Sequence, residues 1–201
     1  GVTYSEKDKL CFNGQRLVPI DEGMTYGRSG TSYILKNDRH IKARIEGRGC
    51  TLKMQHMQNC SVIVTEKNGN ELLFNTQGDK RMFWLAHIKD PMDNKMKVIY
   101  HNYENGAETI PDRIQWTITK NSGPTREIKF YWKERFDKQK FYGGGHLFKR
   151  YRIISKIEVN GKNKDDWKNL FTYKFNHKRG NSTKRNLINW IQLCGVDDRS
   201  N

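Results

Sequence analysis

RIQWTITKNSGPTREIKFYWK, at residues 113–133, contains the period-two pattern that decides the fold. In its first part Ile114 and Trp116 alternate with polar residues, and in its last part Phe130 and Trp132 do the same. Because successive side chains of a β-strand point to opposite faces, the alternation predicts antiparallel strands with one face packed against a core and the other exposed to solvent. The Asn-Ser-Gly-Pro sequence between them is typical of a turn, so the stretch predicts a β-hairpin.

Similar turn sequences separate further alternating or apolar runs along the chain. They occur at Lys67–Asn70, Asp90–Asn94 and Asn160–Asn163. Their Asn, Asp, Gly and Pro residues favour the backbone angles of tight connections between strands. The sequence therefore predicts an all-β fold, an antiparallel meander of about ten strands built from successive hairpins. We expect an open twisted sheet or a partial barrel or shell.

The length and the aromatic content together predict a single domain over residues 1–201. Apolar residues make up only 35% of the chain, but Phe, Trp and Tyr reach 11%. Large rings can build a core from few positions. The tryptophans in or near alternating runs are the predicted core anchors, namely Trp84, Trp116, Trp132 and Trp167.

The chain is strongly basic, with 37 Lys and Arg against 22 Asp and Glu, a net charge of +15. Such a field attracts nucleic acid, anionic lipid, sulfated sugar or an acidic protein, although a merely soluble surface also produces it. Cations and aromatic rings interleave most densely over 126–152. The candidate contacts with a partner or polyanion are Arg126, Lys129, Lys133, Arg135, Lys138, Lys140, Lys149, Arg150 and Arg152. Basic grooves with exposed rings bind single-stranded nucleic acid, but strands with inward rings and outward cations give the same pattern.

Four cysteines, at Cys11, Cys50, Cys60 and Cys194, permit two disulfides. Cys50 and Cys60 are near enough in sequence to staple a hairpin, and Cys11 and Cys194 would then tie the two ends of the chain together. Free buried thiols are the alternative. The sequence has no C-x-x-C pair, so the cysteines do not predict a zinc site.

The sequence contains no persuasive catalytic motif: it lacks a G-x-S-x-G elbow, an H-E-x-x-H pair and a Walker loop. We therefore expect no catalytic residue, no cofactor and no metal. No apolar run approaches the roughly 20 residues that span a bilayer, and no signal peptide is visible. The sequons at Asn59 and Asn181 matter only if the protein follows a eukaryotic secretory route.

Several short motifs follow one another in a recognisable order. They are LCFNGQRL at 10–17, YGRSGTSY at 26–33, FWLAHIKD at 83–90, IKFYWKERFD at 128–137 and IQLCG at 191–195. In this order, over about 10–195, the chain resembles the RHS-repeat and SpvB/TcB-like toxin-complex shell proteins. Residues 36–60 depart from the pattern because they are basic and carry two extra cysteines.

This resemblance implies a shell segment, because such strands in the family form part of a hollow β-structure that holds an unfolded toxin or supports the assembly. The family's enzymatic motifs do not occur in these 201 residues, so no activity carries over. We expect a non-enzymatic, secreted, toxin-associated shell or binding domain that acts through a protein partner, toxin cargo or surface. The alternative is a polyanion- or nucleic-acid-binding protein that uses 126–152. Exposed strand edges would be protected by Lys and Arg or would serve recognition by strand addition.

Overall fold

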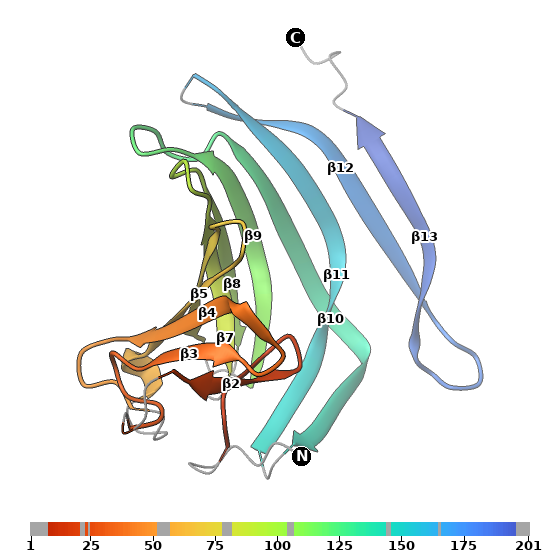
Figure 1. Cartoon of the computed structure of the whole chain (residues 1–201). Coiled ribbons are helices and arrows are strands. Elements are labelled where there is room, and N and C mark those ends of the chain that lie inside the picture. Colours follow the sequence, from red (N-terminus) through yellow and green to blue (C-terminus); the bar gives the residue numbers. More distant parts are fainter. Residues whose placement is uncertain are drawn as a thin grey trace. The chain divides into compact units, whose positions relative to one another are not determined.

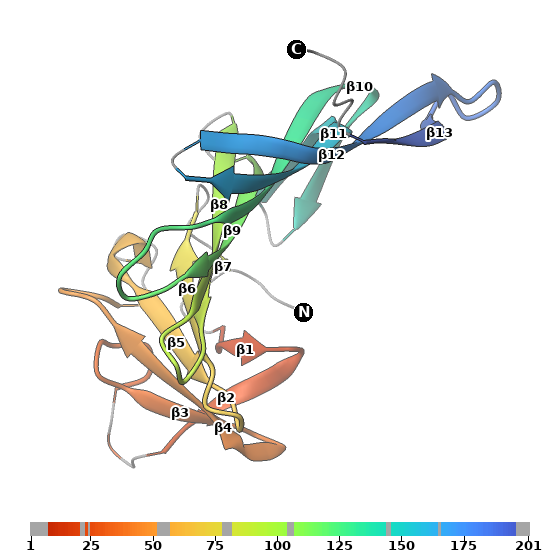
Figure 2. The ribbon, with the colours of Figure 1, turned by 90° about the horizontal axis from the view of Figure 1, so that it is seen from above.

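The computed structural model describes residues 8–20, 23, 25–51, 57–77, 82–103, 107–143, 146–164 and 166–195. Almost all of these residues lie in strands or in the turns between them, with one short 3-10 helix at Met57–Asn59. Each strand pairs with the next one along the chain, which gives one 13-stranded meander sheet (Figures 1 and 2). The predicted all-β antiparallel meander is confirmed, and its first and last strands do not pair to close a barrel.

The strands differ greatly in length. They are β1 (Cys11–Phe12), β2 (Gln15–Pro19), β3 (Ser32–Leu35), β4 (Asp38–Glu46), β5 (Ser61–Thr65), β6 (Glu71–Thr76), β7 (Phe83–Lys89), β8 (Lys95–Tyr103), β9 (Glu108–Ile118), β10 (Arg126–Gly143), β11 (His146–Asn163), β12 (Asp166–Arg179) and β13 (Asn186–Gly195). Contacts group the chain into two compact units, unit 1 over 1–95 with 143–146 and unit 2 over 96–142 with 147–201. The single domain expected from the length stays a prediction.

Unit 1 has a closed apolar core that period-two alternation builds. In β5, Val62 and Val64 are buried while their neighbours in the strand are only partly covered. Tyr33 on β3 and Ile45 on β4 are completely buried. The whole cluster consists of Leu17, Tyr33, Leu35, Ala43, Ile45, Cys50, Cys60, Val62, Val64 and Leu72. Much of this core lies in 32–46, partly inside the basic stretch that departs from the family pattern.

A disulfide fixes the connection between β4 and β5. Cys50 and Cys60 are bonded, their Cα atoms are 5.0 Å apart, and both residues are buried in the core of unit 1. The second pair expected from the sequence is not formed, because Cys11 and Cys194 are both free thiols. They lie on the first and last strands of a sheet that is not closed, so strand pairing does not bring them together.

The hairpin of β9 and β10 in unit 2 has one apolar and one polar row of side chains. Ile128 lies opposite Ile114, and Glu127 lies opposite Gln115. Directly opposite residues of antiparallel strands project to the same face, so the two rows occupy different faces of the sheet. The hairpin predicted at 113–133 is therefore present with the expected sidedness.

The same two rows continue across β11, β12 and β13. Tyr173 lies between Ile157 and Leu193 in the strand register, and Thr172 lies opposite Glu158. A side-chain hydrogen bond from β10 to β11 places their polar rows on one face. The opposite face, called here the apolar face, comprises Ile114, Ile128, Phe130, Ile157, Val159, Phe171, Tyr173, Phe175, Ile191 and Leu193.

The apolar face of unit 2 is not a buried core. All its members are half-buried or exposed, and Ile191 and Leu193 are 55% and 60% exposed. Among the described residues of this unit, the buried polar side chains are Glu108, Glu127, Asn160, Thr172 and His177. Within the described ranges of unit 2, the only buried large apolar residues are Ile110 and Ile118. Unit 2 therefore buries polar groups and leaves its apolar row partly open.

The tryptophan anchors predicted from the sequence need correction. Trp84, Trp116 and Trp132 are only half-buried, and Trp167 is exposed. None of them belongs to the closed core. Alternation identified the faces of their strands correctly for Trp116 and Trp132, but a face becomes a core only when a second layer covers it.

The β10–β11 hairpin changes its neighbours along its length. At one end residues 126–129 of β10 pair with β9. Towards the other end it is β11 that contacts the beginning of β9, because the backbone N–H of Lys149 donates to the Ala107 carbonyl at 2.9 Å. Both strands have 18 residues, and long two-stranded ribbons twist strongly. The second half of β10 is thereby directed towards β12 and β13 instead of β9 (Figure 1).

Candidate partner-binding surface

The nine cations predicted as contacts do not form one uniform surface. Arg126, Lys133, Lys138, Lys140 and Arg150 are exposed, whereas the other four are half-buried. Three of the nine make ion pairs within the sheet: Arg135 with Asp137, Lys138 with Glu134 and Arg152 with Glu108. Of these three pairs, Arg152–Glu108 links β11 to β9, whereas the other two lie within β10.

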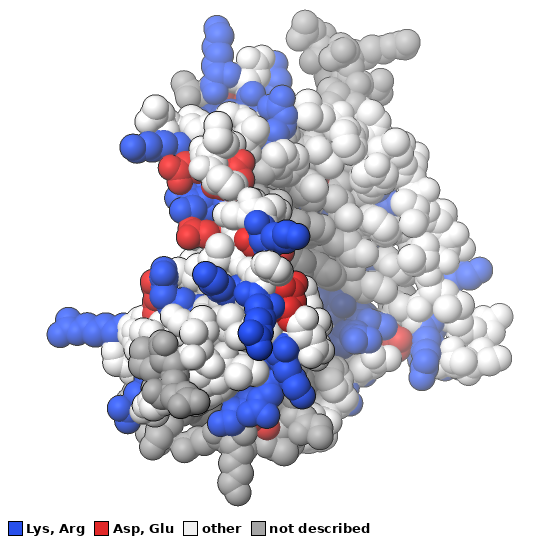
Figure 3. Space-filling view, in the orientation of Figure 1, with Lys and Arg blue, Asp and Glu red and all other residues white. Residues whose placement is uncertain are grey.

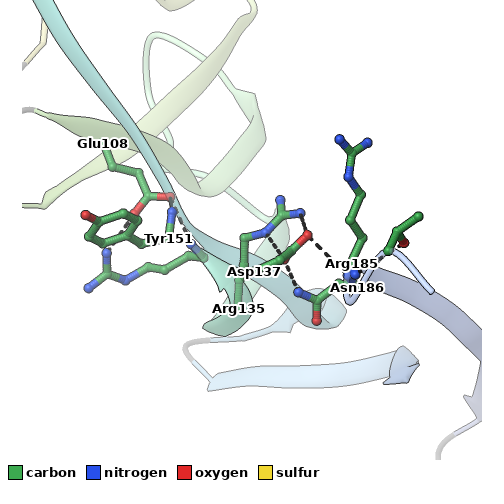
Figure 4. A network of polar contacts seen from close by, with 8 residues as sticks. Glu108, Arg135, Asp137, Tyr151, Arg185 and Asn186 are labelled. Atoms are coloured by element: carbon green, nitrogen blue, oxygen red, sulfur yellow. Dashed lines mark hydrogen bonds and ion pairs between the residues drawn. The ribbon is translucent and has the colours of Figure 1, made fainter. Parts of the chain in front are cut away.

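Glu108 is the centre of a buried ion pair at the beginning of β9. One carboxylate oxygen accepts hydrogen bonds from the backbone N–H groups of Tyr151 and Arg152, at 2.8 and 3.0 Å. The other pairs with the Arg152 guanidinium at 2.8 Å. That guanidinium also stacks on the Tyr103 ring, 3.2 Å from its centroid. The carboxylate is fully engaged (Figure 4), as a buried charge must be to offset its desolvation.

A second polar cluster connects β10 to the beginning of β13. Arg135 pairs with Asp137 at 2.9 Å, and Asp137 accepts hydrogen bonds from both the backbone and the side-chain amide of Asn186. The Arg135 hydrogen bond, followed by those from Asn186, holds the pKa of Asp137 well below its usual range. We call these three residues the clamp (Figure 4). It joins segments 49 residues apart in sequence.

His177 on β12 is buried without a hydrogen bond. No described residue contacts either ring nitrogen at hydrogen-bond distance, and the residue is 8% exposed. Burial, followed by the positive charges of Lys133 and Arg135, lowers the pKa of His177. The ring is therefore neutral at pH 7. Sequence reasoning missed this residue because a lone His in a strand gives no sign of its surroundings.

The polar face of unit 2 carries a chain of hydrogen bonds across four strands. Gln115 donates to Glu127 at 2.7 Å, and Asn160 also donates to Glu127, at 3.4 Å. Asn169 donates to Asn160, and Thr172 donates to Asn169. We call this series the polar ladder. It satisfies the buried side chains of Glu127, Asn160 and Thr172 and so stabilises the sheet without an apolar layer on that face.

A second group on the polar face links β10 and β11. The Tyr131 hydroxyl donates to Glu158 at 2.6 Å, and Lys156 pairs with the same carboxylate at 2.6 Å. Lys156 also lies over the Tyr131 ring. Burial and the hydrogen bond to Glu158 raise the pKa of Tyr131 to about 12. These groups are mutually satisfied and act as structural contacts.

The arrangement gives little support to bond-making chemistry. Among the described residues no group of three or more His, Cys, Asp and Glu side chains is placed to hold a metal ion. Glu108, Glu127 and Asp137 are occupied by partners within the sheet. The expected absence of catalytic residues, cofactor and metal stays a prediction.

The strand β13 presents the most exposed apolar surface of the protein's described part. Five of its ten residues are large, apolar and 44–60% exposed: Leu187, Ile188, Trp190, Ile191 and Leu193. Ile188, Ile191 and Leu193 extend the apolar face, whereas Leu187 and Trp190 lie opposite Lys178 and Asn176 and project to the other side of the sheet. In Figure 3 the area over β11–β13 is largely free of charged side chains. Sequence reasoning did not identify this segment as an exposed apolar surface.

Two other features of the chain bear on its environment. No helix in the described ranges is long and apolar enough to cross a membrane. Asn181 lies exposed in the turn between β12 and β13, whereas the side chain of Asn59 is outside the described residues. The use of either sequon stays untested.

The fold defines the class of this protein: a long antiparallel β-meander that is not closed into a barrel. No protein-family model and no curated protein sequence matches the chain. Solved structures do share its fold. The N-terminal domain of the effector protein SpvB from Salmonella typhimurium strain LT2 matches with a TM-score of 0.74 at 9% identity, over 98% of this chain and 83% of that one.

Two toxin-complex structures share the fold as well. TcdB2-TccC3 matches with a TM-score of 0.71 at 10% identity, over 97% of this chain and 13% of that one. The Photorhabdus luminescens Tc holotoxin pore, with a mutation in TccC3, matches with a TM-score of 0.66 at 9% identity, over 90% of this chain and 12% of that one. This chain thus spans a small fraction of the toxin-complex chains. The structural likeness to SpvB and Tc components that the short motifs predict is confirmed.

Proposed function

We propose that this chain is a non-enzymatic, secreted, toxin-associated β-shell domain that binds a partner protein or toxin cargo along the apolar face of unit 2. The half-exposed apolar face carries the proposal. Large contiguous apolar patches are rare on soluble proteins and mark interaction sites. The fold shared with the N-terminal domain of the effector protein SpvB and with a Tc holotoxin supports the association with toxins.

The two faces of unit 2 divide stability and binding between them. The polar ladder satisfies buried groups such as Glu127 and Asn160 and holds the strands in register. Phe171, Tyr173 and Phe175 on the other face are half-buried and carry no such network. A partner that covers them removes further apolar area from water, at about 25 cal/mol for each Å². Such a surface binds by apolar contact and has little dependence on salt.

Binding of an unfolded polypeptide tests the proposal. The probe is a protein that is kept unfolded by reduction and carboxamidomethylation, and its disulfide-intact folded form is the control. We expect this chain to bind the unfolded form, as measured by fluorescence anisotropy. Phe175→Glu should weaken binding at least tenfold, whereas Asn176→Glu, the same charge change at the next residue, should not. The proposal would be contradicted if the Phe175→Glu and Asn176→Glu variants bound the unfolded protein equally well, or if this chain did not bind the unfolded protein.

Polyanion binding is the second candidate, and one observation at the far end of the β10–β11 hairpin favours it. Phe141 stacks on Phe148 with a centroid distance of 5.3 Å and an interplanar angle of 13°. Tyr142 beside them is 75% exposed, and Lys140 and Arg150 are exposed as well. Exposed rings next to cations suit the stacking of bases together with phosphate contacts.

A salt series separates the two candidates. Polyanion binding releases counterions, so the affinity for single-stranded RNA, DNA or heparin should fall steeply as salt rises. Tight binding near physiological salt that is lost in the double variant Lys140→Glu, Arg150→Glu would support this candidate. Weak binding that is equal for all three ligands would eliminate it.

A further inference from the structure

The two ends of the meander differ in their ability to pair with another chain. β1 has two residues, and a strand that short offers almost no backbone for pairing. β13 has ten residues, and within the described ranges it pairs with β12 alone and its other edge has no partner strand. An open edge of this length presents a row of unpaired backbone N–H and C=O groups.

β13 also lacks most devices that keep such an edge from pairing. Its sequence, NLINWIQLCG, contains no charged residue and no proline. A β-bulge at Asn189 interrupts the pairing with β12, but Trp190–Gly195 beyond it pair in regular register. Ile191 and Leu193 in this regular part are 55% and 60% exposed on the apolar face. The regular part is therefore a usable template for one more strand.

The charged side chains around β13 indicate what kind of additional strand would pair with its edge. Residues 166–195, the β12–β13 hairpin, contain one acidic residue, Asp166. The same residues contain six cations, all exposed: Lys168, Lys174, Lys178, Arg179, Lys184 and Arg185. None of the six pairs with a described carboxylate, and Arg185 extends away from the clamp in Figure 4. Pairing of two copies through β13 would bring two such basic hairpins together, so the charges disfavour a second copy.

We propose that the edge of β13 binds an extended segment of a partner polypeptide in which acidic and apolar residues alternate, by β-strand addition. The apolar side chains of the added strand extend the apolar face beside Ile191 and Leu193. Its acidic side chains project to the other face, near Lys174 on β12. That lysine lies two strand spacings away, roughly 10 Å, which a long side chain spans in part. This inference rests on the proposed function because it specifies where and how the protein partner docks.

Three designed peptides of equal length test the chemistry. The first alternates Glu with Ile and Tyr, the second has Lys in place of every Glu, and the third is the first with two central prolines. We expect the acidic peptide to bind, the basic one to bind at least tenfold more weakly, and the proline peptide not to bind, by anisotropy of a fluorescent label. Equal binding of the acidic and basic peptides, or of the proline peptide, would overturn the proposal.

Matched variants test the place of binding. The double variant Ile191→Ser, Leu193→Ser should weaken binding of the acidic peptide at least tenfold, whereas Met92→Ser, at an 82% exposed position in a turn, should leave it unchanged. Lys174→Glu with Lys178→Glu should shift the preference towards the basic peptide. Lys97→Glu with Lys120→Glu makes the same net charge change on exposed residues elsewhere and should not.

The same binding assays show whether a failure concerns only strand addition at β13 or also the proposed function on which it rests. If the acidic peptide fails to bind while the unfolded protein still binds in a Phe175-dependent way, β-strand addition at β13 is wrong and the proposed function stands. If light scattering shows a dimer that Leu193→Ser dissociates, a second copy occupies the edge and the inference is also wrong. Circular dichroism of each variant checks that the sheet has formed.

Discussion

Units 1 and 2 are built from similar alternating strands but bury opposite kinds of side chain. In unit 1, Tyr33, Ile45 and Val64 are almost fully buried in an apolar cluster. In unit 2 the buried side chains include Glu127 and Asn160, while the apolar row stays half-exposed. The difference shows that alternation fixes which face a side chain lies on, whereas burial depends on what covers that face. Unit 1 covers its own apolar face, whereas the apolar face of unit 2 stays partly uncovered.

The largest effect should come from truncating the core of unit 1. Ile45→Ala removes a fully buried side chain and should cost about 3 kcal/mol of unfolding free energy, because a cavity remains. Ile157→Ala makes the same change on the half-buried apolar face of unit 2 and should cost only about 1 kcal/mol. Urea unfolding followed by circular dichroism measures both. Equal losses would show that the apolar face is as well packed as the core.

Removing the disulfide should have the next largest effect. Replacing Cys50 and Cys60 together by Ala frees a loop of about ten residues and should cost about 2.5 kcal/mol through the entropy of the unfolded chain. The control variant replaces Cys11 and Cys194 by Ala and should be nearly neutral, since both are free thiols. Urea midpoints with and without a reducing agent provide the measurement. A loss in the control variant would mean that these two thiols are bonded.

The clamp should contribute less to the free energy of unfolding than the disulfide, and its contribution should be confined to unit 2. Asp137→Asn leaves Arg135 without its charged partner and should cost about 2 kcal/mol, typical of hydrogen bonds to a charged group. Glu134→Gln removes an exposed ion pair with Lys138 and should have no measurable effect. Hydrogen exchange of the β10 and β13 amides should report the loss locally. Uniform exchange changes over both units would argue against a local role for the clamp.

The clamp also predicts a response to acid. The pKa of Asp137 is lowered in the folded state, so its stabilising contribution is complete above the usual carboxyl pKa of 3.8. It is lost as the pH falls below that value, where the unfolded state binds the proton first. In Asp137→Asn this part of the acid sensitivity should disappear. If the variant and the natural protein lose stability equally below pH 4, the carboxylate makes no net contribution.

The smallest effect should be the pH dependence caused by His177. Its pKa is lowered by burial and by Lys133 and Arg135, so below pH 6.5 the unfolded chain binds a proton that the folded chain does not. Unit 2 should therefore lose stability between pH 7.5 and 5.5, in a range where the clamp does not titrate. His177→Leu should reduce this loss, which urea midpoints at the two pH values measure. An unchanged difference in the variant would exclude His177 as its cause.

The sequence predicted the elements well where local signals dominate. The hairpin at 113–133 follows from alternation and turn residues, which are properties of a few neighbouring positions. The turn predicted at Asn160–Asn163 is wrong, because these residues continue β11 and pair with β12, so the connection comes after Asn163. The core in 32–46 was missed, although Ala43 and Ile45 alternate with Lys42 and Arg44, because the basic composition of this segment hid its period.

Contacts between distant segments could not be predicted from the sequence. Glu108 pairs with Arg152, which lies 44 residues further along the chain, and the local sequence around either residue does not indicate the other. The tryptophan anchors were wrong because a large ring on an alternating strand does not reveal whether a second layer exists. The open β13 edge depends on the order of all the strands, which no local pattern contains.

The strictly sequential order of the strands has a consequence for how the chain can assemble. Because each strand pairs with the one synthesised just before it, the sheet can grow strand by strand from the N-terminal side as the chain emerges from a ribosome. Each strand can form its first row of backbone hydrogen bonds with the preceding strand, without a partner from a distant part of the sequence. Unfolding can proceed in reverse, with β13 and then β12 separating from the sheet by the loss of one row of hydrogen bonds at a time.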